Sequence, residues 1–390
     1  MGETKKIAIL CSGGDAPGYN AAVIGATKAA ESLGYEVIGF VRGFDGLYNN
    51  KYIPLKTAEI ESHLREGGSY LHSARFQPFN NETTRQPAIE RCVENANALG
   101  LEGLIVIGGD GSFAGARDLI YCGTKNDPSQ GIHCICIPGT IDNDIACTDY
   151  TIGFDTALNT VVELCDKLAD TDRAHDRCMI AEVMGNLAGD LPLYASIASN
   201  ATDVLIGETF TEADVTTAAG RVKQAYLRGQ RYFLILVAEG ITFKIQKDGS
   251  IIYPGPTLDS RDHHGIERIA KEIQKATQDV TPNGEGIECR YVQFGHVQRG
   301  GRPTAKDRIT GMQMGALAAQ LLMDGQYNLV TIIKNGLLTT CTYEECLAAK
   351  ELQKLRRADP DPAARVKPEL IDDILLATEG HYPEYLVRRS

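Results

Sequence analysis

The chain has 390 residues, of which 43% are hydrophobic, so it is long enough for about two or three compact domains. Its net charge of -12 disfavours a nucleic-acid scaffold, and an anionic ligand would need a local basic site. The apolar run after Met1–Lys6 is too short for a signal peptide, and no run is long enough to span a bilayer. The eleven cysteines include no CxxC pair, which favours buried, reduced thiols. We therefore expect a cytoplasmic protein that binds neither nucleic acid nor membranes.

Short apolar strands alternate with helices in the first half of the chain. We expect strands at 6–10, 36–40, 104–107 and 134–137, and helices at about 21–33 and from about 112. Continuously apolar strands are typical of a parallel sheet that is covered on both faces. Ligands on such sheets bind beyond the carboxyl ends of the strands, where three of the glycine-rich turns of this chain fall.

A second α/β unit is expected to begin near residue 151. Its buried strands are predicted at 179–183 and 232–237, and its helices at 215–228 and 265–278. A helix at 309–322 then returns to the first unit.

The first turn, at 12–20, reads SGGDAPGYN. Glycines between a strand and a helix let backbone N–H groups approach phosphate oxygens. Gly13 and Gly18 have the spacing of a Walker A motif, but Tyr19 and Asn20 stand where Lys and Ser or Thr belong. The GxGxxG pattern also fails, because Asp15 takes the place of its second glycine. A tight structural turn explains this segment equally well.

The second turn, at 108–112, reads GGDGS and follows a buried strand. Its acidic residue, Asp110, is suited to holding Mg²⁺ while the backbone binds phosphate. The alternative is a carboxylate that caps the next helix, but a cap does not require three neighbouring glycines.

The third turn, at 138–144, reads PGTIDND. In an extended segment Asp142 and Asp144 would project to the same side. One carboxylate would then accept the proton of an acceptor hydroxyl while the other orients metal or sugar. An Asx-rich surface turn is the alternative, and taken alone it is the better explanation. Four arginines, at 75, 177, 290 and 299, become candidates for phosphate binding only if the fold brings them together.

The combination of these turns with Met184-Gly185 and the GHVQRGG segment at 295–301 resembles the 6-phosphofructokinase family. The resemblance covers roughly residues 5–325. It implies an α/β fold with two Rossmann-like domains, a parallel sheet in the larger one and the active site in the cleft between them. The expected domains are 1–150 plus about 298–358 for ATP and 151–297 for the sugar phosphate, followed by a tail at 359–390.

The resemblance also implies the reaction, in which the γ-phosphate of ATP passes to the 1-hydroxyl of fructose 6-phosphate and gives fructose 1,6-bisphosphate in glycolysis. Asp142 would be the general base, with Thr140 and Asp144 beside it. Arg75 and the backbone of Gly14 would stabilise the phosphoryl group in flight. Asp110 would serve Mg²⁺.

The other implied ligand contacts fall into two sets. Those for ATP are Gly14, Arg75, Phe76, Arg85, Gly109, Asp110, Gly111, Ser112 and Gly115. Those for the sugar phosphate are Thr140, Asp142, Arg177, Met184, Gly185, Asn186, Glu239, Arg290, His296 and Arg299. Arg177 and Arg290 resemble arginines that the family supplies from a neighbouring subunit, so a homo-oligomer, usually a tetramer, is implied.

Two glycines bear on the phosphate donor. Members of the family that use ATP have glycine at the positions of Gly111 and Gly139, whereas pyrophosphate users typically have Asp and Lys, which fill the space of the nucleotide. We therefore expect ATP as the donor. The chain departs from the family at Asn186, where an arginine usually follows Met-Gly.

Four alternatives remain open at this point. The first two are a pyrophosphate-dependent phosphofructokinase and a kinase for a related sugar phosphate. A nicotinamide-dependent dehydrogenase is disfavoured by the failed GxGxxG pattern. A non-catalytic sensor of sugar phosphate or nucleotide is slightly supported by Asn186, but a sensor would not need the carboxylates or Arg75.

Overall fold

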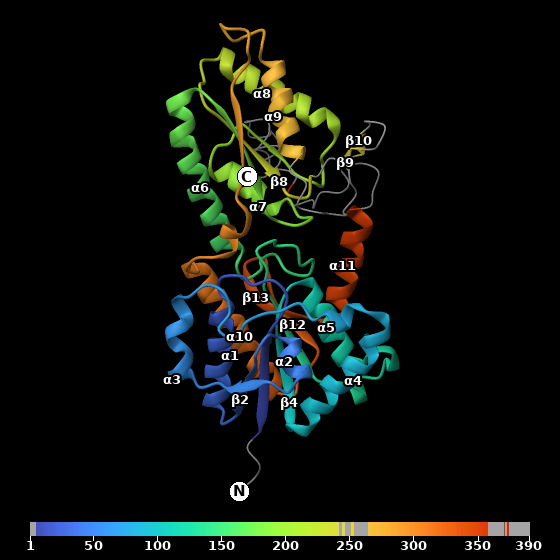
Figure 1. Ribbon diagram of the computed structural model, residues 1–390. Coiled ribbons are helices and arrows are strands. Elements are labelled where there is room, and N and C mark those ends of the chain that lie inside the picture. The colour runs from blue at the N-terminus through green and yellow to red at the C-terminus, as the bar shows by residue number, and fades with distance from the viewer. Residues whose placement is uncertain are drawn as a thin grey trace. The chain divides into compact units, whose positions relative to one another are not determined.

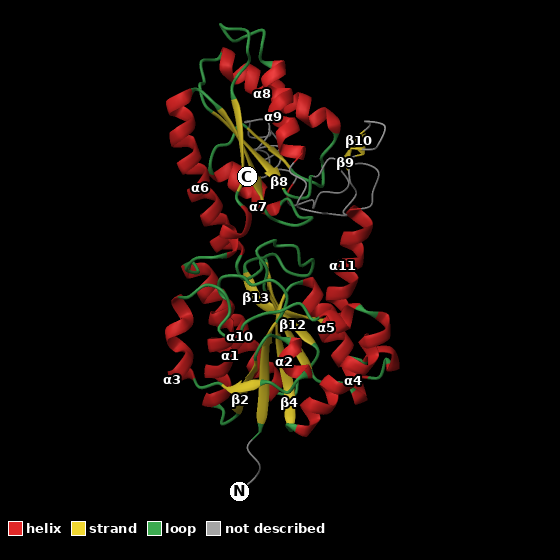
Figure 2. Ribbon diagram, viewed as in Figure 1, coloured by secondary structure: helices red, strands yellow, loops and turns green. Residues whose placement is uncertain are grey.

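A computed structural model describes residues 5–241, 244–245, 251–252, 264–357, 370 and 373. The tail expected at 359–390 lies almost wholly outside these residues. The chain divides into two compact units (Figures 1 and 2). The first comprises Met1–Ala157 and Arg299–Leu352, and the second comprises Leu158–Gln298 and Gln353–Ser390. Within the described part of the chain, no helix combines the length and the apolar character needed to cross a membrane.

The first unit is built on a seven-stranded sheet in the order β13-β12-β5-β4-β1-β2-β3. The five central strands are parallel, and the edge strands β3 and β13 are antiparallel to their neighbours. The strands are β1 (Lys6–Cys11), β2 (Glu36–Phe40), β3 (Tyr52–Pro54), β4 (Leu101–Gly108), β5 (Cys134–Pro138), β12 (Leu329–Lys334) and β13 (Leu337–Thr342). The predicted parallel sheet of the larger domain is thus confirmed.

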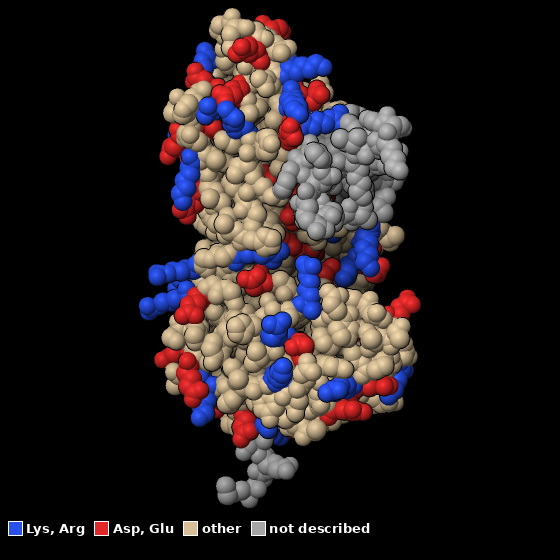
Figure 3. Space-filling model, viewed as in Figure 1, with Lys and Arg blue, Asp and Glu red and all other residues tan. Residues whose placement is uncertain are grey.

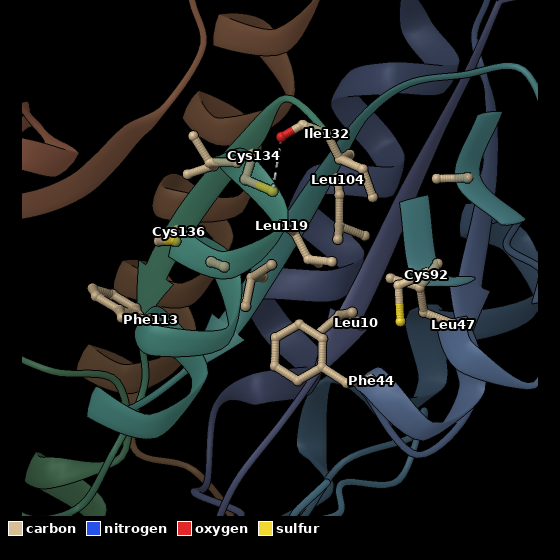
Figure 4. Close-up of a cluster of buried hydrophobic side chains, with 14 of the residues drawn as sticks. Leu10, Phe44, Leu47, Cys92, Leu104, Phe113, Leu119, Ile132, Cys134 and Cys136 are labelled. Carbon is tan, nitrogen blue, oxygen red and sulfur yellow. Dashed lines mark hydrogen bonds between the residues drawn. The ribbon is translucent and has the colours of Figure 1, made fainter. Parts of the chain in front are cut away.

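Helices cover both faces of this sheet. Ala8 and Leu10 belong to a buried cluster with residues of α2, α4 and α5 (Figure 4), while Ile7 and Ile9, which point to the opposite face, are buried as well. On that opposite face α1 and α10 pack against each other (Figure 1). The α-helices of the unit are α1 (Tyr19–Ser32), α2 (Phe44–Tyr48), α3 (Thr57–Ile60), α4 (Glu82–Ala98), α5 (Asp110–Ile120), α10 (Ala305–Met323) and α11 (Tyr343–Arg357). Short 3-10 helices are η1 (Glu61–Arg65), η2 (Gln77–Asn80), η3 (Gly123–Lys125) and η4 (Pro128–Gln130).

The second unit contains a smaller, fully parallel sheet in the order β11-β6-β8-β7. Its core packs β6 and β8 against α8 and α9. The strands are β6 (Cys178–Val183), β7 (Asp203–Leu205), β8 (Phe233–Ala238) and β11 (Cys289–Gln293), with a separate pair β9 (Lys244–Ile245) and β10 (Ile251–Ile252). The helices are α6 (Phe154–His175), α7 (Asp190–Ala198), α8 (Glu212–Leu227), α9 (His264–Ala276) and the 3-10 helix η5 (Gly295–Arg299).

On the face shown in Figure 3, acidic and basic side chains are interspersed over each unit. On this face, the mixture of both signs is typical of a solvated surface.

A buried carboxylate ties the segment after the third turn to α10. Asp307 is fully buried, and its oxygens accept hydrogen bonds from the hydroxyl of Tyr150 (2.5 Å) and from the amides of Gly153 (2.7 Å) and Thr156 (2.8 Å). Burial raises the pKa of Asp307, although these hydrogen bonds oppose the rise. The Thr156 hydroxyl also donates to Asp307, and all three donor residues are buried, so their hydrogen bonds depend on this one side chain.

Substitution Asp307→Ala is expected to lower the free energy of unfolding by about 3 kcal/mol, because it leaves several buried donors without an acceptor. Urea denaturation followed by circular dichroism measures this loss. Asp324→Ala, at an exposed position that ends α10, is the matched control and should change the stability by less than about 0.5 kcal/mol. Equal effects of the two substitutions would show that the Asp307 hydrogen bonds contribute nothing.

Candidate active site

The three glycine-rich turns lie side by side at one edge of the large sheet. They follow β1, β4 and β5, which are adjacent in the sheet. The amide of Ser12 donates to the carbonyl of Ile107 (3.0 Å), and the amide of Gly139 donates to the carbonyl of Gly108 (3.0 Å). The parallel strands therefore bring the three turns together at one edge of the sheet, as the sequence predicts.

Tyr19 joins the first turn to the third. Its buried hydroxyl donates to the carbonyl of Gly139 (2.6 Å), and the carbonyl of Gly14 lies 3.1 Å away. Burial raises the pKa of Tyr19 well above its usual value, so the phenol keeps its proton and remains a donor. Tyr19 thus has a structural reason to stand where a Walker A motif would have lysine.

The two glycines linked to donor choice differ in their surroundings. A β-carbon on Gly111 would meet no atom within 4 Å, whereas one on Gly139 would lie 2.4 Å from Cε1 of Tyr19. Gly111 therefore opens onto unfilled space at the start of α5. A side chain at 139 would first collide with Tyr19, so the steric reason for glycine there includes this ring.

The third turn is not extended, and the argument that an extended segment places Asp142 and Asp144 on the same side was wrong. Residues 141–142 form a turn, and Asn143 has a left-handed backbone with φ of 52°. Asn143 is suited to this conformation because its Oδ1 accepts a hydrogen bond from the amide of Thr151 (3.0 Å). The Thr151 hydroxyl in turn donates to the carbonyl of Thr140 (2.7 Å).

Asp142 is held inside this turn. The residue is 8% exposed, and its amide donates to the hydroxyl of Thr140 (3.2 Å). Asp144 is half-buried. Asp142 and Thr140, both expected near the acceptor hydroxyl, are therefore in direct contact. The burial of Asp142 also argues against a solvated surface turn.

The second turn presents Asp110 at the start of α5. Oδ2 of Asp110 lies 3.0 Å from the ammonium of Lys350, a contact that could not be predicted from the sequence. Ser112 is buried, and its Oγ has no hydrogen-bond partner among the described residues. A buried hydroxyl without a hydrogen-bond partner destabilises the folded protein, unless a ligand supplies the partner. No cluster of three or more metal-binding side chains occurs in the described ranges, so a metal here would rely on Asp110 and on the substrate itself.

Aromatic rings line the neighbourhood of α5 and η2. Phe76 lies 4.9 Å from Phe79 and 5.4 Å from Tyr48, measured between ring centroids. Phe44 packs 5.2 Å from Phe79. A β-carbon on Gly115 would approach Phe44 to 2.7 Å, which explains the glycine. Phe76 and Gly115, two of the expected ATP contacts, therefore belong to one apolar cluster.

The predicted phosphate-binding arginines of the first unit have different surroundings. Arg75 is exposed. Arg85 donates to both carboxylate oxygens of the buried Asp118, at 2.8 and 2.6 Å, so a structural ion pair uses this guanidinium. Arg299 donates from Nη1 to the carbonyl of Asp15 (3.3 Å), and a β-carbon on Gly14 would lie 2.8 Å from the same Nη1. Arg299, expected to bind the sugar phosphate, therefore contacts the first turn.

In the second unit, Glu239 organises the loop after β6. Its Oε1 accepts hydrogen bonds from the amides of Gly185 (3.2 Å) and Asn186 (2.6 Å). The amide of Met184 donates to Gln298 (3.1 Å), a buried residue of η5. Four of the predicted sugar-phosphate residues thus form one cluster, and His296 is exposed on η5.

Arg177 and Arg290 converge on one carboxylate. Nε of Arg177 lies 2.9 Å from Glu288, and Nη2 of Arg290 lies 2.5 Å from the other oxygen of the same residue. The hydrogen bond from Arg177 is the largest of the effects that lower the pKa of Glu288. Arg177 and Arg290, which resemble the arginines that the family supplies to a neighbouring subunit, are therefore close together in this chain.

Substitution Gly139→Ala is expected to lower the free energy of unfolding by about 1–3 kcal/mol, because the new methyl group overlaps the Tyr19 ring. Gly111→Ala is the matched control. It places a methyl group in open space within a helix and should raise stability by about 0.5–1 kcal/mol. Thermal melts of both variants measure the difference. Adding Tyr19→Leu to Gly139→Ala should cost less than the sum of the single effects. Fully additive effects would rule out the steric explanation.

Comparisons with known proteins identify the family of the chain. The family model of phosphofructokinase matches residues 6–322. The ATP-dependent 6-phosphofructokinase of Halothermothrix orenii is 38% identical over 90% of this chain and 96% of its own length. That of Lysinibacillus sphaericus is 41% identical over 85% of this chain and 90% of its own length.

Solved structures show the same fold. Phosphofructokinase from Saccharomyces cerevisiae aligns with a TM-score of 0.80 at 24% identity, over 96% of this chain and 50% of that chain. Pichia pastoris phosphofructokinase in the T-state aligns with a TM-score of 0.80 at 26% identity, over 97% of this chain and 39% of that chain. This chain therefore spans half or less of the two yeast chains. On the match over residues 6–322 and the identity to full-length relatives, the chain belongs to the phosphofructokinase family.

Proposed function

We propose that the protein is an ATP-dependent 6-phosphofructokinase, which transfers the γ-phosphate of ATP to the 1-hydroxyl of fructose 6-phosphate and yields fructose 1,6-bisphosphate in glycolysis. The observation that carries the proposal is the buried Asp142 in the third turn, beside the second turn with its acidic residue and glycines. The names of the relatives at 38% and 41% identity support the same activity.

Asp142 would serve as the general base. In phosphoryl transfer, the main tasks of the protein are to position the reactants and to accept the proton of the attacking hydroxyl. Thr140 holds the backbone of Asp142 through its hydroxyl, and the bonds from Thr151 fix the turn. The base would therefore be positioned before the substrate binds, which reduces the ordering needed at the moment of reaction.

The donor would lie against the first two turns. The start of α5, the open space at Gly111 and the hydroxyl of Ser112 offer backbone and side-chain contacts to phosphate oxygens. Mg²⁺ commonly uses one or two carboxylates together with substrate phosphates, so the single carboxylate of Asp110 fits this ion. When bound, Mg²⁺ would neutralise charge on the transferring phosphates. Arg75 and Gly14 would complete the contacts to the phosphoryl group.

The acceptor would contact the cluster around Glu239 and the exposed His296. We propose further that Arg177 and Arg290 meet the sugar phosphate of a neighbouring subunit in a cytoplasmic homo-oligomer. Both arginines form an ion pair with Glu288, which keeps their guanidinium groups adjacent. Two adjacent guanidinium groups are what binding of one phosphate requires, so this contact supports the proposal. Light scattering on the purified protein measures its mass in solution, which should be a multiple of the mass of one chain.

With purified enzyme and Mg²⁺, we expect turnover of fructose 6-phosphate with ATP and little or none with pyrophosphate. A coupled assay that crosses ATP, GTP and pyrophosphate with fructose 6-phosphate and sedoheptulose 7-phosphate measures this. Predominant use of pyrophosphate would establish the alternative donor, and predominant use of the seven-carbon sugar would establish the alternative acceptor.

In the same assay, Asp142→Ser should lower kcat by about 10²–10⁴ with little change in either KM, because the base is lost while binding contacts remain. Asp324→Ser, at an exposed position, is the control and should behave as wild type. If Asp142→Ser kept the wild-type kcat, another group would have to accept the proton.

Gly111→Asp is expected to raise the KM for ATP by about tenfold or more, because a carboxylate would enter the open space where the nucleotide is proposed to bind. Gly220→Asp is a suitable control, since Gly220 also lies in a helix with no atom within 4 Å of its missing β-carbon. A Gly111→Asp enzyme with unchanged KM for ATP would contradict this account of donor choice.

A further inference from the structure

A lysine from helix α11 reaches the second turn. Lys350 lies in α11, beyond residue 322, where the family match ends. Its ammonium is 3.0 Å from Oδ2 of Asp110, and the lysine side chain is 24% exposed. In the surface pair of Lys125 with Glu90, by comparison, the lysine is 42% exposed. The charge of Lys350 is therefore less screened by water and acts more strongly on neighbouring groups.

The position of Lys350 is fixed by the packing of α11, and not by the ion pair alone. Tyr343, in the first turn of α11, is buried, and its hydroxyl donates to the carbonyl of Phe113 in α5. Sγ of Cys346 lies 2.9 Å from Sγ of Cys147. Lys350 follows Tyr343 by two helical turns and Cys346 by one, so the three residues share a face of the helix. The buried contacts thus hold the lysine toward the start of α5.

The site that Lys350 reaches already favours anions. Asp110 is the first residue of α5, and backbone N–H groups at a helix N-terminus carry partial positive charge. The space beyond Gly111 is open, and the hydroxyl of Ser112 has no partner among the described residues. An ammonium group beside this opening adds a full charge to the partial charges of the backbone.

We propose that Lys350 belongs to the donor site, where its ammonium orients Asp110 and contacts the phosphate chain of the bound nucleotide. The proposal rests on the function proposed above. A lysine ammonium has three N–H donors, so its contact with Asp110 leaves capacity for phosphate oxygens. Lysine binds phosphate as a point charge, which suits a chain of phosphates whose oxygens present no single fixed geometry. Helix α11 would then be part of the catalytic unit.

The opposite interpretation is that Lys350 competes with the metal for Asp110. Two cations near one carboxylate repel each other unless a polyanion separates them. Under competition, removal of the lysine would make Mg²⁺ bind more tightly and would leave donor affinity unchanged or improved. The two interpretations therefore predict changes of opposite sign.

The test uses the 390-residue enzyme with Lys350→Met, Lys350→Gln and Lys350→Arg. We expect both neutral variants to raise the KM for ATP about tenfold, since a hydrogen bond to a charged group is lost, and to keep the KM for fructose 6-phosphate within about twofold. Lys350→Arg should recover part of the affinity. Lys125→Met is the matched control, because it also removes a lysine from an ion pair and should match wild type.

Calorimetric titration with ATP and Mg²⁺, in the absence of sugar phosphate, provides a second measurement that does not depend on turnover. We expect the neutral variants to bind ATP about tenfold more weakly, with melting temperatures close to wild type. Unchanged or tighter ATP binding, or a lower Mg²⁺ requirement, would overturn the proposal. A wild-type enzyme that binds ATP but does not phosphorylate fructose 6-phosphate would refute the proposed function, while this titration would still decide the role of Lys350.

Discussion

The contact of Tyr19 with Gly139 is the interaction on which the candidate site depends. The phenol fills the position where a side chain at 139 would lie, and its hydroxyl is hydrogen-bonded to the third turn and lies close to the first. The parallel sheet brings the three turns to one edge, where backbone hydrogen bonds join neighbouring turns, but the first and third turns follow strands separated by β4 and need a further constraint. A buried donor that cannot lose its proton at neutral pH provides that constraint. The glycine at 139 and the tyrosine at 19 therefore act as one structural unit.

Much of the fold could be predicted from the sequence, because it depends on patterns that are local. Continuous apolar runs such as 104–107 indicated parallel strands, and the glycine-rich turns marked their carboxyl ends. The starts of helices were less well predicted. α1 begins at Tyr19 and α5 at Asp110, each two residues before the predicted start, since Gly18 and Gly109 occupy the positions that precede the first helical turn.

The parts that the sequence did not reveal are those that depend on contacts between distant segments. Nothing local to Lys350 distinguishes it from a surface lysine, and only the packing of α11 brings it to Asp110. The burial of Asp307 likewise could not be predicted, because its hydrogen-bond donors Tyr150, Gly153 and Thr156 all lie more than 150 positions away along the chain. The prediction that Asp142 and Asp144 lie on the same side failed because of Asn143. Its left-handed backbone interrupts the regular alternation of side chains that an extended strand would have.

The central claim is that the turns transfer a phosphoryl group from ATP to a sugar phosphate. It is tested most directly by following an isotopic label from the γ-phosphate of ATP into product with wild-type enzyme, fructose 6-phosphate and Mg²⁺. The account predicts that the label appears on the oxygen of carbon 1, as located by ³¹P nuclear magnetic resonance and mass spectrometry. Label released only as inorganic phosphate, or no transfer from ATP at all, would contradict it.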